Sequence, residues 1–207
     1  MDPYQVTRDF EAALCKYTGA SYAVAVNSCT SALQLSMEWF ARSVLAHQNL
    51  EVSIPRRTYP SVASAVQSSG LQLSFDSRDW VSCYRIKPLP VWDCARKFTG
   101  GMYRRGQFQC VSFASSKILG IEQGGAILHD SPGVDGWFRR MRFDGRTEGK
   151  DLMHDKIHEA GHHMIMLPSI AAQALLKLSF LPRHNKDMPK RKYPDLSRMN
   201  AWSHYNA

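Results

Sequence analysis

Short apolar segments alternate with longer segments of helical spacing along most of this chain. Helical spacing covers residues 6–17, 29–46, 58–69, 133–143 and 168–180, and apolar segments cover 22–26, 51–54, 71–75, 89–92, 110–114 and 125–128. Strands that alternate with helices indicate βαβ units, in which helices cover both faces of one sheet. We therefore expect a three-layer α/β/α fold with a mostly parallel sheet. Ligands of such sheets bind beyond the carboxyl ends of the strands, so functional residues should follow strands directly.

The bulk composition excludes several classes of protein. Apolar residues make up 44% and charged residues 21% of the chain, as in ordinary globular domains. No apolar stretch approaches the ~20 residues that span a bilayer, and the first residues, MDPYQVTRDFEAAL, lack the basic region and apolar run of a signal peptide. The five cysteines are odd in number and form no C-x-x-C pair, which argues against a disulfide framework or a zinc ribbon. We expect a cytoplasmic protein without a membrane partner.

The formal net charge of +8 is compatible with an anionic ligand, and for residues 183–207 an ordinary solvated tail explains the charge at least as well. Basic residues concentrate at 139–146 and in the segment 183–207, which we expect to be a basic C-terminal tail after a domain spanning residues 1–182. A basic surface attracts polyanions, either a nucleotide diphosphate or a nucleic acid. The chain contains no recognised nucleic-acid-binding motif, so composition alone supports nucleic acid, and we favour a small-molecule ligand.

Four polar sites come after predicted strands: the turn at residues 27–30, Tyr59, Asp93 and Lys117. A pyridoxal phosphate site needs a lysine for a Schiff base and a carboxylate that keeps the pyridine nitrogen protonated. It also needs backbone amides and hydroxyls at a helix N-terminus for the phosphate, and a flat side chain over the ring. Taken singly, each site has an ordinary structural explanation, such as a helix N-cap, a core aromatic or a surface lysine.

Taken together and in order, these sites resemble the DegT/StrS-type pyridoxal-phosphate-dependent sugar aminotransferases over residues 7–130. The segments that carry the resemblance are NSCTSALQLSM, IPRRTYPSVASAV, VWDCARKFTG, VSFASSK and the Gln123-Gly124-Gly125 that follows. The resemblance implies the large-domain fold of fold-type I pyridoxal phosphate enzymes. It also implies catalytic roles for Lys117, the Schiff-base lysine, and Asp93, the partner of the pyridine nitrogen. The implied cofactor contacts are Ser28, Cys29, Thr30, Tyr59, Asp93, Arg96, Ser112 and Lys117.

The chain departs from the family pattern at several places. Cys29 replaces a glycine of the phosphate turn, Arg96 stands where a glutamine is usual, and Ala114 replaces the histidine before the lysine. Only 16 residues separate Asp76 from Asp93, where relatives carry another helix and strand, and the family's C-terminal small domain is not present in the chain. Two interpretations remain open: a compact working aminotransferase, or a reduced relative that binds the cofactor but turns over another substrate or none. Retention of Lys117, Asp93 and Tyr59 favours the first.

The resemblance also implies a reaction. An amino acid such as glutamate or glutamine donates nitrogen to a nucleotide-linked keto sugar, and Lys117 moves the proton. We expect the diphosphate of the acceptor to meet a basic rim that includes Arg139, Arg140 and Arg142. We further expect a homodimer with composite active sites, in which the segment from His162 to Leu178, with His162 and His163 as candidate contacts, covers the neighbouring site.

A second motif points to different chemistry. Residues 158–162 read His-Glu-Ala-Gly-His, a match to H-E-x-x-H, and His154 lies four residues before it. On a helix this spacing places two imidazoles on one face to bind zinc, with Glu159 as the base. Gly161 weakens such a helix, and no glutamate follows Glu159 to supply a third ligand. We therefore expect a histidine cluster without a metal, and keep the zinc hydrolase as an alternative.

Overall fold

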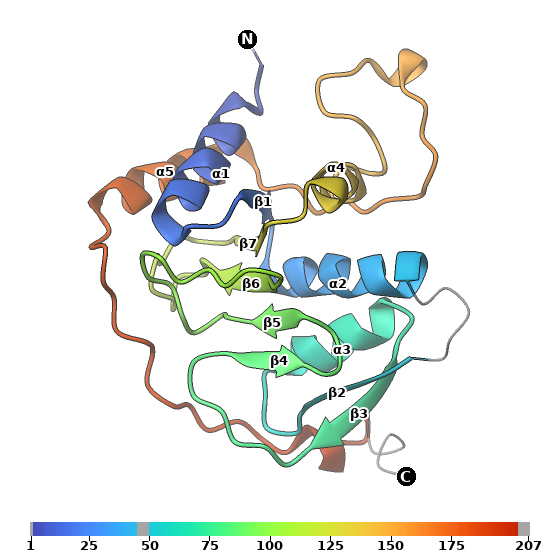
Figure 1. Ribbon diagram of the computed structural model, residues 1–207, viewed down its shortest axis with the longest axis vertical. Helices are drawn as coiled ribbons and strands as arrows, with labels where there is room; N and C mark the ends of the chain where they lie inside the picture. Colours follow the sequence, from blue (N-terminus) through green and yellow to red (C-terminus); the bar gives the residue numbers. More distant parts are fainter. Residues whose placement is uncertain (1, 45–49, 203–207) are drawn as a thin grey trace.

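The computed structural model describes residues 2–44 and 50–202 (Figure 1). The α-helices are α1 (Gln5–Thr18), α2 (Cys29–Trp39), α3 (Pro60–Ser68), α4 (Pro132–Met141) and α5 (Pro168–Phe180). The strands are β1 (Tyr22–Val26), β2 (Glu51–Pro55), β3 (Gln72–Asp76), β4 (Tyr84–Ile86), β5 (Val91–Asp93), β6 (Phe108–Ser112) and β7 (Gly125–His129). None of the helices in these two ranges combines the length and the apolar character needed to cross a bilayer.

Most strands of the sheet run in one direction. Five strands pair in the order β1-β7-β6-β5-β4, and β2 pairs with β3. A single bridge between Ser53 of β2 and Lys87, which follows β4, joins the two sets. The β5–β6 and β2–β3 pairs are parallel, whereas β7 and β4 run antiparallel to their neighbours. Five of the seven strands in the described residues therefore share a direction, as the sequence predicted.

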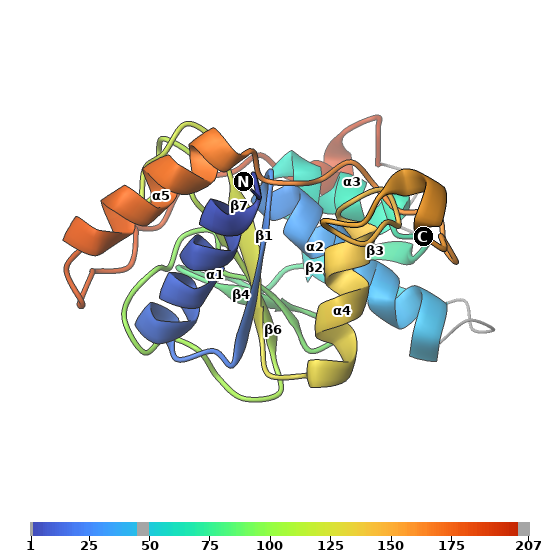
Figure 2. The same cartoon turned by 90° about the horizontal axis from the view of Figure 1, so that it is seen from above.

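Helices cover both faces of the sheet. Figure 2 shows α1 and α5 on one side of the strands and α2, α3 and α4 on the other. The alternation of side chains along β1 explains this arrangement, because successive residues of a strand point to opposite faces. Val24 and Val26 pack in the core beneath α2 and α3, whereas Ala23 and Ala25 pack with the α1 side chains, among them Phe10. The predicted three-layer α/β/α architecture is confirmed.

The structure corrects some predicted boundaries. The helix predicted over 29–46 ends as an α-helix at Trp39 and continues as a π-helix from Phe40 to Val44, while 45–46 lie outside the described residues. The strands predicted at 89–92 and 110–114 are observed at Val91–Asp93 and Phe108–Ser112. The sequence did not predict β4, since a strand of three residues is too short to show a periodic pattern.

The C-terminal segment packs back onto the domain. Figure 1 shows it running from α5 along one side of the molecule to the edge formed by β3. Its backbone is held by hydrogen bonds from Gly100 N to Arg183 O (2.7 Å), from Met188 N to Arg96 O (3.0 Å) and from Leu196 N to Arg56 O (2.9 Å). The Leu196 side chain is fully buried in the core. This segment consequently lies against the ends of the strands rather than apart from the sheet.

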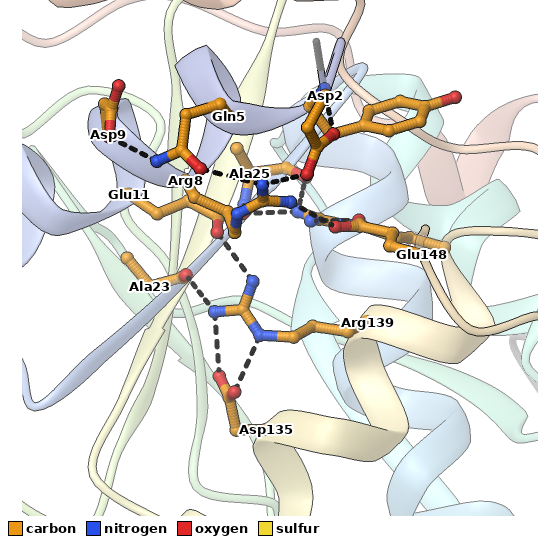
Figure 3. Close-up of polar contacts among 12 residues, drawn as sticks. Asp2, Gln5, Arg8, Asp9, Glu11, Ala23, Ala25, Asp135, Arg139 and Glu148 are labelled. Atoms are coloured by element: carbon orange, nitrogen blue, oxygen red, sulfur yellow. Dashed lines mark hydrogen bonds and ion pairs between the residues drawn. The ribbon is translucent and has the colours of Figure 1, made fainter. Parts of the chain in front are cut away.

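A buried ionic network joins α1 to α4 (Figure 3). Glu11 of α1 accepts hydrogen bonds from Arg139 Nη1 (2.6 Å), from Arg142 Nη1 and from the backbone N–H of Ala25 in β1 (2.8 Å). Arg142 is only 1% exposed and also donates to Glu148 (2.6 Å). Burial by itself lowers the pKa of Arg142, but the carboxylates of Glu11 and Glu148 raise it above its ordinary value. The guanidinium group of Arg142 therefore stays charged inside the protein.

Replacing Glu11 by glutamine should lower the free energy of unfolding by about 3 kcal/mol, because it leaves the buried guanidinium of Arg142 and the partly exposed guanidinium of Arg139 without one of their counter-charges. Denaturant unfolding monitored by circular dichroism measures this change. The matched control is Asp9→Asn, an exposed carboxylate on the same helix that contacts only the Gln5 amide; it should change stability by no more than about 0.5 kcal/mol. Equal losses of unfolding free energy in Glu11→Gln and Asp9→Asn would show that the ionic network stabilises the fold no more than an exposed carboxylate does.

Candidate active site

One cavity collects all of the residues that the sequence predicted as cofactor contacts. It has a volume of about 430 Å³ and lies at the carboxyl ends of β1, β5 and β6. The predicted residues in its lining are Ser28, Cys29, Thr30, Tyr59, Asp93, Arg96, Ser112 and Lys117. They come from four separate stretches of the chain, and the sheet topology is what brings them together.

The turn between β1 and α2 presents hydroxyl groups beside a helix N-terminus. Ser28 has an extended backbone and caps α2, accepting a hydrogen bond from Ser31 N (3.0 Å). Thr30 Oγ1 lies 2.7 Å from Ser61 Oγ of α3, so two more hydroxyls meet at the same place. The first turn of an α-helix has N–H groups without an intrahelical partner, and together with the helix dipole they attract an anion. This corner of the cavity has the donors that a phosphate group needs.

Gly125 determines how closely β7 approaches that turn. A Cβ atom at this position would lie 2.5 Å from both Cys29 N and Ser28 C, a separation that carbon atoms do not tolerate. The neighbouring Gly124 has φ +137° and faces Met166, whose Cε would lie 2.8 Å from an added Cβ. The two glycines that follow Gln123 are therefore required by close packing behind the turn.

Gly125→Ala should displace the turn and lower the free energy of unfolding by about 1–3 kcal/mol, the usual cost of overpacking a core. Thermal unfolding measures the loss. Gly133→Ala is the control, since an added Cβ there meets no atom within 4 Å and the residue lies in α4; it should leave stability unchanged or raise it by up to about 1 kcal/mol. A Gly125→Ala protein as stable as the control would contradict the close approach.

Asp93 ends β5 and is buried, with 6% of the residue exposed. Its Oδ1 accepts a hydrogen bond from Ala95 N (2.9 Å). Burial raises the pKa of Asp93, while the Ala95 N–H, the Tyr84 hydroxyl and the positive charge of Lys117 oppose the rise. Tyr84 faces Asp93 across the β4–β5 pair and lies 2.6 Å from Thr58 Oγ1 through its hydroxyl. Tyr84 was not among the predicted site residues, because it lies in the three-residue strand β4, which has no recognisable pattern.

Lys117 follows β6 and is half-buried in the same cavity. Burial lowers its pKa; the charge of Asp93 acts in the opposite direction, and the guanidinium groups of Arg96 and Arg191 reinforce the decrease. The Nζ atom forms no hydrogen bond or ion pair with any residue that the structure describes. An amine of lowered pKa without a fixed partner is suited to react with a carbonyl group.

The remaining predicted residues complete the walls of the cavity. Arg96 is buried, and its guanidinium donates to the carbonyl of Pro189 in the C-terminal segment. Tyr59 is 58% exposed, at the opening of the cavity. Trp80 and Tyr193 also line the cavity and were not predicted; their rings stack with centroids 5.8 Å apart and an interplanar angle of 18°. Both lie in irregular segments, where no periodicity signals an inward-facing side chain.

The predicted basic rim of Arg139, Arg140 and Arg142 is wrong. Arg139 and Arg140 line a different cavity of about 520 Å³, with residues of α1 and β1. Arg142 is buried in the ionic network with Glu11 and Glu148. None of the three lines the cavity that holds Lys117. The sequence shows where cations cluster along the chain but not which of them are neutralised by carboxylates from distant segments.

The helix that the zinc alternative requires is absent from residues 155–167, which contain no helical residue. This segment instead runs beside residues 143–145, with a bridge between Phe143 and His163 and a close backbone approach of Gly161 to Gly145. His162 contacts Glu38 (2.9 Å) and His154 contacts Asp151 (3.1 Å). Among the described residues, no three metal-binding side chains come together.

Cys83 lies directly before β4 and packs in the cluster that contains Cys94, the residue after Asp93. The thiol of Cys94 lowers the pKa of Cys83 to about 7, although burial opposes the shift. The thiolate fraction of Cys83, and with it the rate of alkylation by iodoacetamide, should therefore rise with pH through a midpoint near pH 7. Cys15 is the control, since burial raises its pKa to about 11. Peptide mapping of alkylation against pH tests this order, and faster labelling of Cys15 at neutral pH would contradict it.

Comparison with known proteins agrees with this fold. Residues 1–82 match the sequence model of the DegT/DnrJ/EryC1/StrS aminotransferase family. No curated protein matches the chain. Similar solved structures include AtS13 from Actinomadura melliaura, with a TM-score of 0.75 and 18% identity over 87% of this chain and 61% of that one.

Two further solved structures are similar to this chain. The sugar aminotransferase CalS13 from Micromonospora echinospora has a TM-score of 0.72 and 18% identity over 86% of this chain and 61% of that one. PseC from Helicobacter pylori, an aminotransferase involved in the biosynthesis of pseudoaminic acid, has a TM-score of 0.67 and 19% identity over 86% of this chain and 58% of that one. The chain thus spans about three fifths of the length of the structures it resembles.

Proposed function

We propose that this chain, whose residues 1–82 match the model of the DegT/DnrJ/EryC1/StrS aminotransferase family, is an aminotransferase that holds pyridoxal phosphate through Lys117. The observation that carries the proposal is the meeting of Lys117, Asp93 and the N-terminus of α2 in one cavity. The amino donor is an amino acid such as glutamate, and the acceptor is a keto sugar linked to a nucleotide.

The residues of the cavity fit this cofactor of the family. The N-terminus of α2, with the hydroxyls of Thr30 and Ser61, suits its phosphate, and Ser112 stands beside them. The buried carboxylate of Asp93 suits a protonated pyridine nitrogen. When bound, pyridoxal phosphate supplies an electron sink for the bond being broken in the substrate.

The chain's own residues then have defined tasks. Asp93 would place a negative charge at the pyridine nitrogen. The positive charge of the protonated nitrogen would in turn lower the pKa of Asp93 and offset the increase that burial causes. Lys117, once its amine is released, accepts the proton from the α-carbon of the donor, for which its lowered pKa is suited. Tyr59 covers one face of the cavity, and Trp80 with Tyr193 excludes water from its outer wall.

A single-turnover experiment tests the proposal. The protein is loaded with pyridoxal phosphate and mixed with glutamate, and 2-oxoglutarate is measured; a second sample is reduced with borohydride and its modified lysine is mapped by mass spectrometry. We expect stoichiometric 2-oxoglutarate and a modified Lys117. Modification of other lysines only would refute the site. Modification of Lys117 without 2-oxoglutarate would favour the reduced relative that binds the cofactor without turnover.

We also propose that the protein is a homodimer that uses the outer face of α5 and the residues before it. The structure leaves large apolar side chains exposed there, with Leu167 at 56%, Leu176 at 61% and Phe180 at 80%, and exposed apolar patches of this kind are typical of interaction sites. Sedimentation of the cofactor-loaded protein and of Phe180→Asp tests the idea. A monomer at micromolar concentration that still carries the cofactor would show that one chain builds the site alone.

A further inference from the structure

Two cysteines face each other where β4 begins and β5 ends. The two strands pair antiparallel, with Tyr84 opposite Asp93. The same register, continued by one residue on each strand, places Cys83 directly opposite Cys94. Successive residues of a strand point to opposite faces of the sheet, and both cysteines accordingly pack in the cluster on the side of α1 and α5 (Figure 2), whereas Tyr84 packs on the other side.

Backbone hydrogen bonds show what kind of pair the two cysteines form. Cys94 N donates to Cys110 O of β6 (2.8 Å), and Pro90 O of the same segment accepts from Phe108 N of β6 (2.9 Å). Cys94 therefore directs its backbone N–H toward β6 and not toward β4. The Cα atoms of such a non-hydrogen-bonded antiparallel pair lie about 4.5 Å apart, with the side chains at their closest. Disulfides need a Cα separation of about 4.4–6.8 Å, so the register allows a bond between Cys83 and Cys94.

The two thiols differ in access and in acidity. Cys83 is half-buried, whereas Cys94 is only 2% exposed. The Cys94 thiol lowers the pKa of Cys83 to about 7, with help from the Ser82 hydroxyl and the charge of Lys97, although burial and Asp187 oppose the shift. The same contact and burial raise the pKa of Cys94 well above its ordinary value. An accessible thiolate beside a second thiol is the arrangement that redox-sensitive cysteines share.

The other three cysteines lack this combination. Cys29 and Cys110 are neighbours, since Cys29 Sγ donates to Cys110 O (3.5 Å). Both are buried, and burial raises the pKa of each thiol. Burial also raises the pKa of Cys15 to about 11. All five cysteines lie in the described part of the chain, and among them the pair at β4 and β5 joins an accessible thiolate to a facing thiol.

We propose that Cys83 and Cys94 form a reversible disulfide when the protein meets a peroxide. The Cys83 thiolate attacks one peroxide oxygen and breaks the O–O bond. Cys83 becomes a sulfenic acid, and the hydroxide that leaves takes up the proton that Cys83 had lost. The Cys94 sulfur then loses its proton, attacks the Cys83 sulfur and displaces a second water. The two thiols lose two electrons, and the peroxide gains them as it becomes water.

The bond would reinforce a short part of the sheet. Strand β4 has three residues, and the bridge from Lys87 to Ser53 connects it to β2. A covalent link at its first residue would hold β4 against β5 beside Asp93. The inference concerns the thiols alone and does not depend on the proposed aminotransferase reaction.

Peptide mapping after oxidation tests the proposal. The folded protein is treated with an equal molar amount of hydrogen peroxide, remaining thiols are blocked with iodoacetamide in denaturant, and intact and trypsin-digested samples are analysed without reductant. We expect the unblocked protein to lose about 2 Da, the two hydrogens of the thiols. Trypsin cuts after Arg85, so the bond should join the peptides 79–85 and 86–96, and dithiothreitol should release them.

Three variants, checked for folding by circular dichroism, separate the two roles. Cys94→Ser removes the second thiol, so the link should be lost and dimedone should trap a sulfenic acid on Cys83. Cys83→Ser should block the link and leave Cys94 unoxidised. Cys15→Ser is the matched control, because Cys15 is also partly exposed, and it should form the link to the same extent as the parent protein.

Two results would overturn the proposal. One is a parent protein in which Cys83 is oxidised to the sulfinic acid while Cys94 remains free, since the facing thiol would then be out of reach. The other is a disulfide that joins two chains, seen as a doubled mass without reductant, since the thiols would then meet across molecules rather than across β4 and β5.

Discussion

Replacing Lys117 by alanine is expected to abolish the covalent attachment of pyridoxal phosphate and to slow release of 2-oxoglutarate from glutamate by at least about 10³-fold, within the range attributed to a positioned acid–base group. The side chain is the amine of lowered pKa in the cavity that also holds Asp93. Its removal takes away both the site of attachment and the group that receives the α-carbon proton. Mass spectrometry of the reduced protein and single-turnover kinetics measure the two losses independently.

Lys16→Ala serves as the control for Lys117→Ala, because Lys16 is an exposed residue of α1. Its adduct and turnover should match those of the parent protein. The expectation fails if Lys117→Ala retains a reducible adduct of normal stoichiometry, since another lysine would then hold the cofactor. Methylamine added to the variant gives a further test, because a small amine restores turnover only when the missing group is an amine within the cavity.

Replacing Asp93 by asparagine is expected to reduce turnover by about 10²–10³-fold, the usual loss when one preorganised electrostatic contact is removed from an active site. Asparagine has nearly the same shape and keeps an oxygen to accept the 2.9 Å hydrogen bond from Ala95 N. The fold and cofactor binding should therefore persist, while the charge that keeps the pyridine nitrogen protonated is lost.

The Asp93→Asn result is interpreted against cofactor content measured in the same sample. A variant that binds pyridoxal phosphate at Lys117 but barely deaminates glutamate is the expected outcome. Equal single-turnover rates for parent and variant would remove Asp93 from the mechanism. Loss of the cofactor together with lower thermal stability would instead mean that the carboxylate acts mainly in the structure, through Ala95 and Tyr84.

The positions of residues that follow predicted strands could be predicted well from the sequence. Ser28, Asp93 and Lys117 each follow an apolar segment that was recognisable as a strand, and parallel strands bring such positions to one edge of the sheet. The cavity that contains all of the predicted contacts is the consequence of that rule. Their individual roles stay predictions until the substitutions above are measured.

Boundaries and short elements were harder to predict. The three-residue strand β4 carries Tyr84 to Asp93, yet its sequence has no periodicity to distinguish it from a loop. The H-E-x-x-H motif is the opposite case, a recognisable pattern without the expected element: its spacing is compatible with a zinc site only on a helix, and Gly161 instead allows the close approach of its segment to Gly145.

The sequence by itself determined the layered architecture and the identity of the residues around Lys117. The hydrophobic period, the order of the strands and the residue types can all be read directly along the chain. Only the tertiary structure decided where charge acts. It buries Arg142 between Glu11 and Glu148, and it carries Lys190, Arg191 and Lys192 back to Arg56 and Arg57. The physical reason is that a charge is neutralised, or left free to attract a ligand, by groups within a few ångströms of it, and those neighbours come from segments that are far apart along the chain.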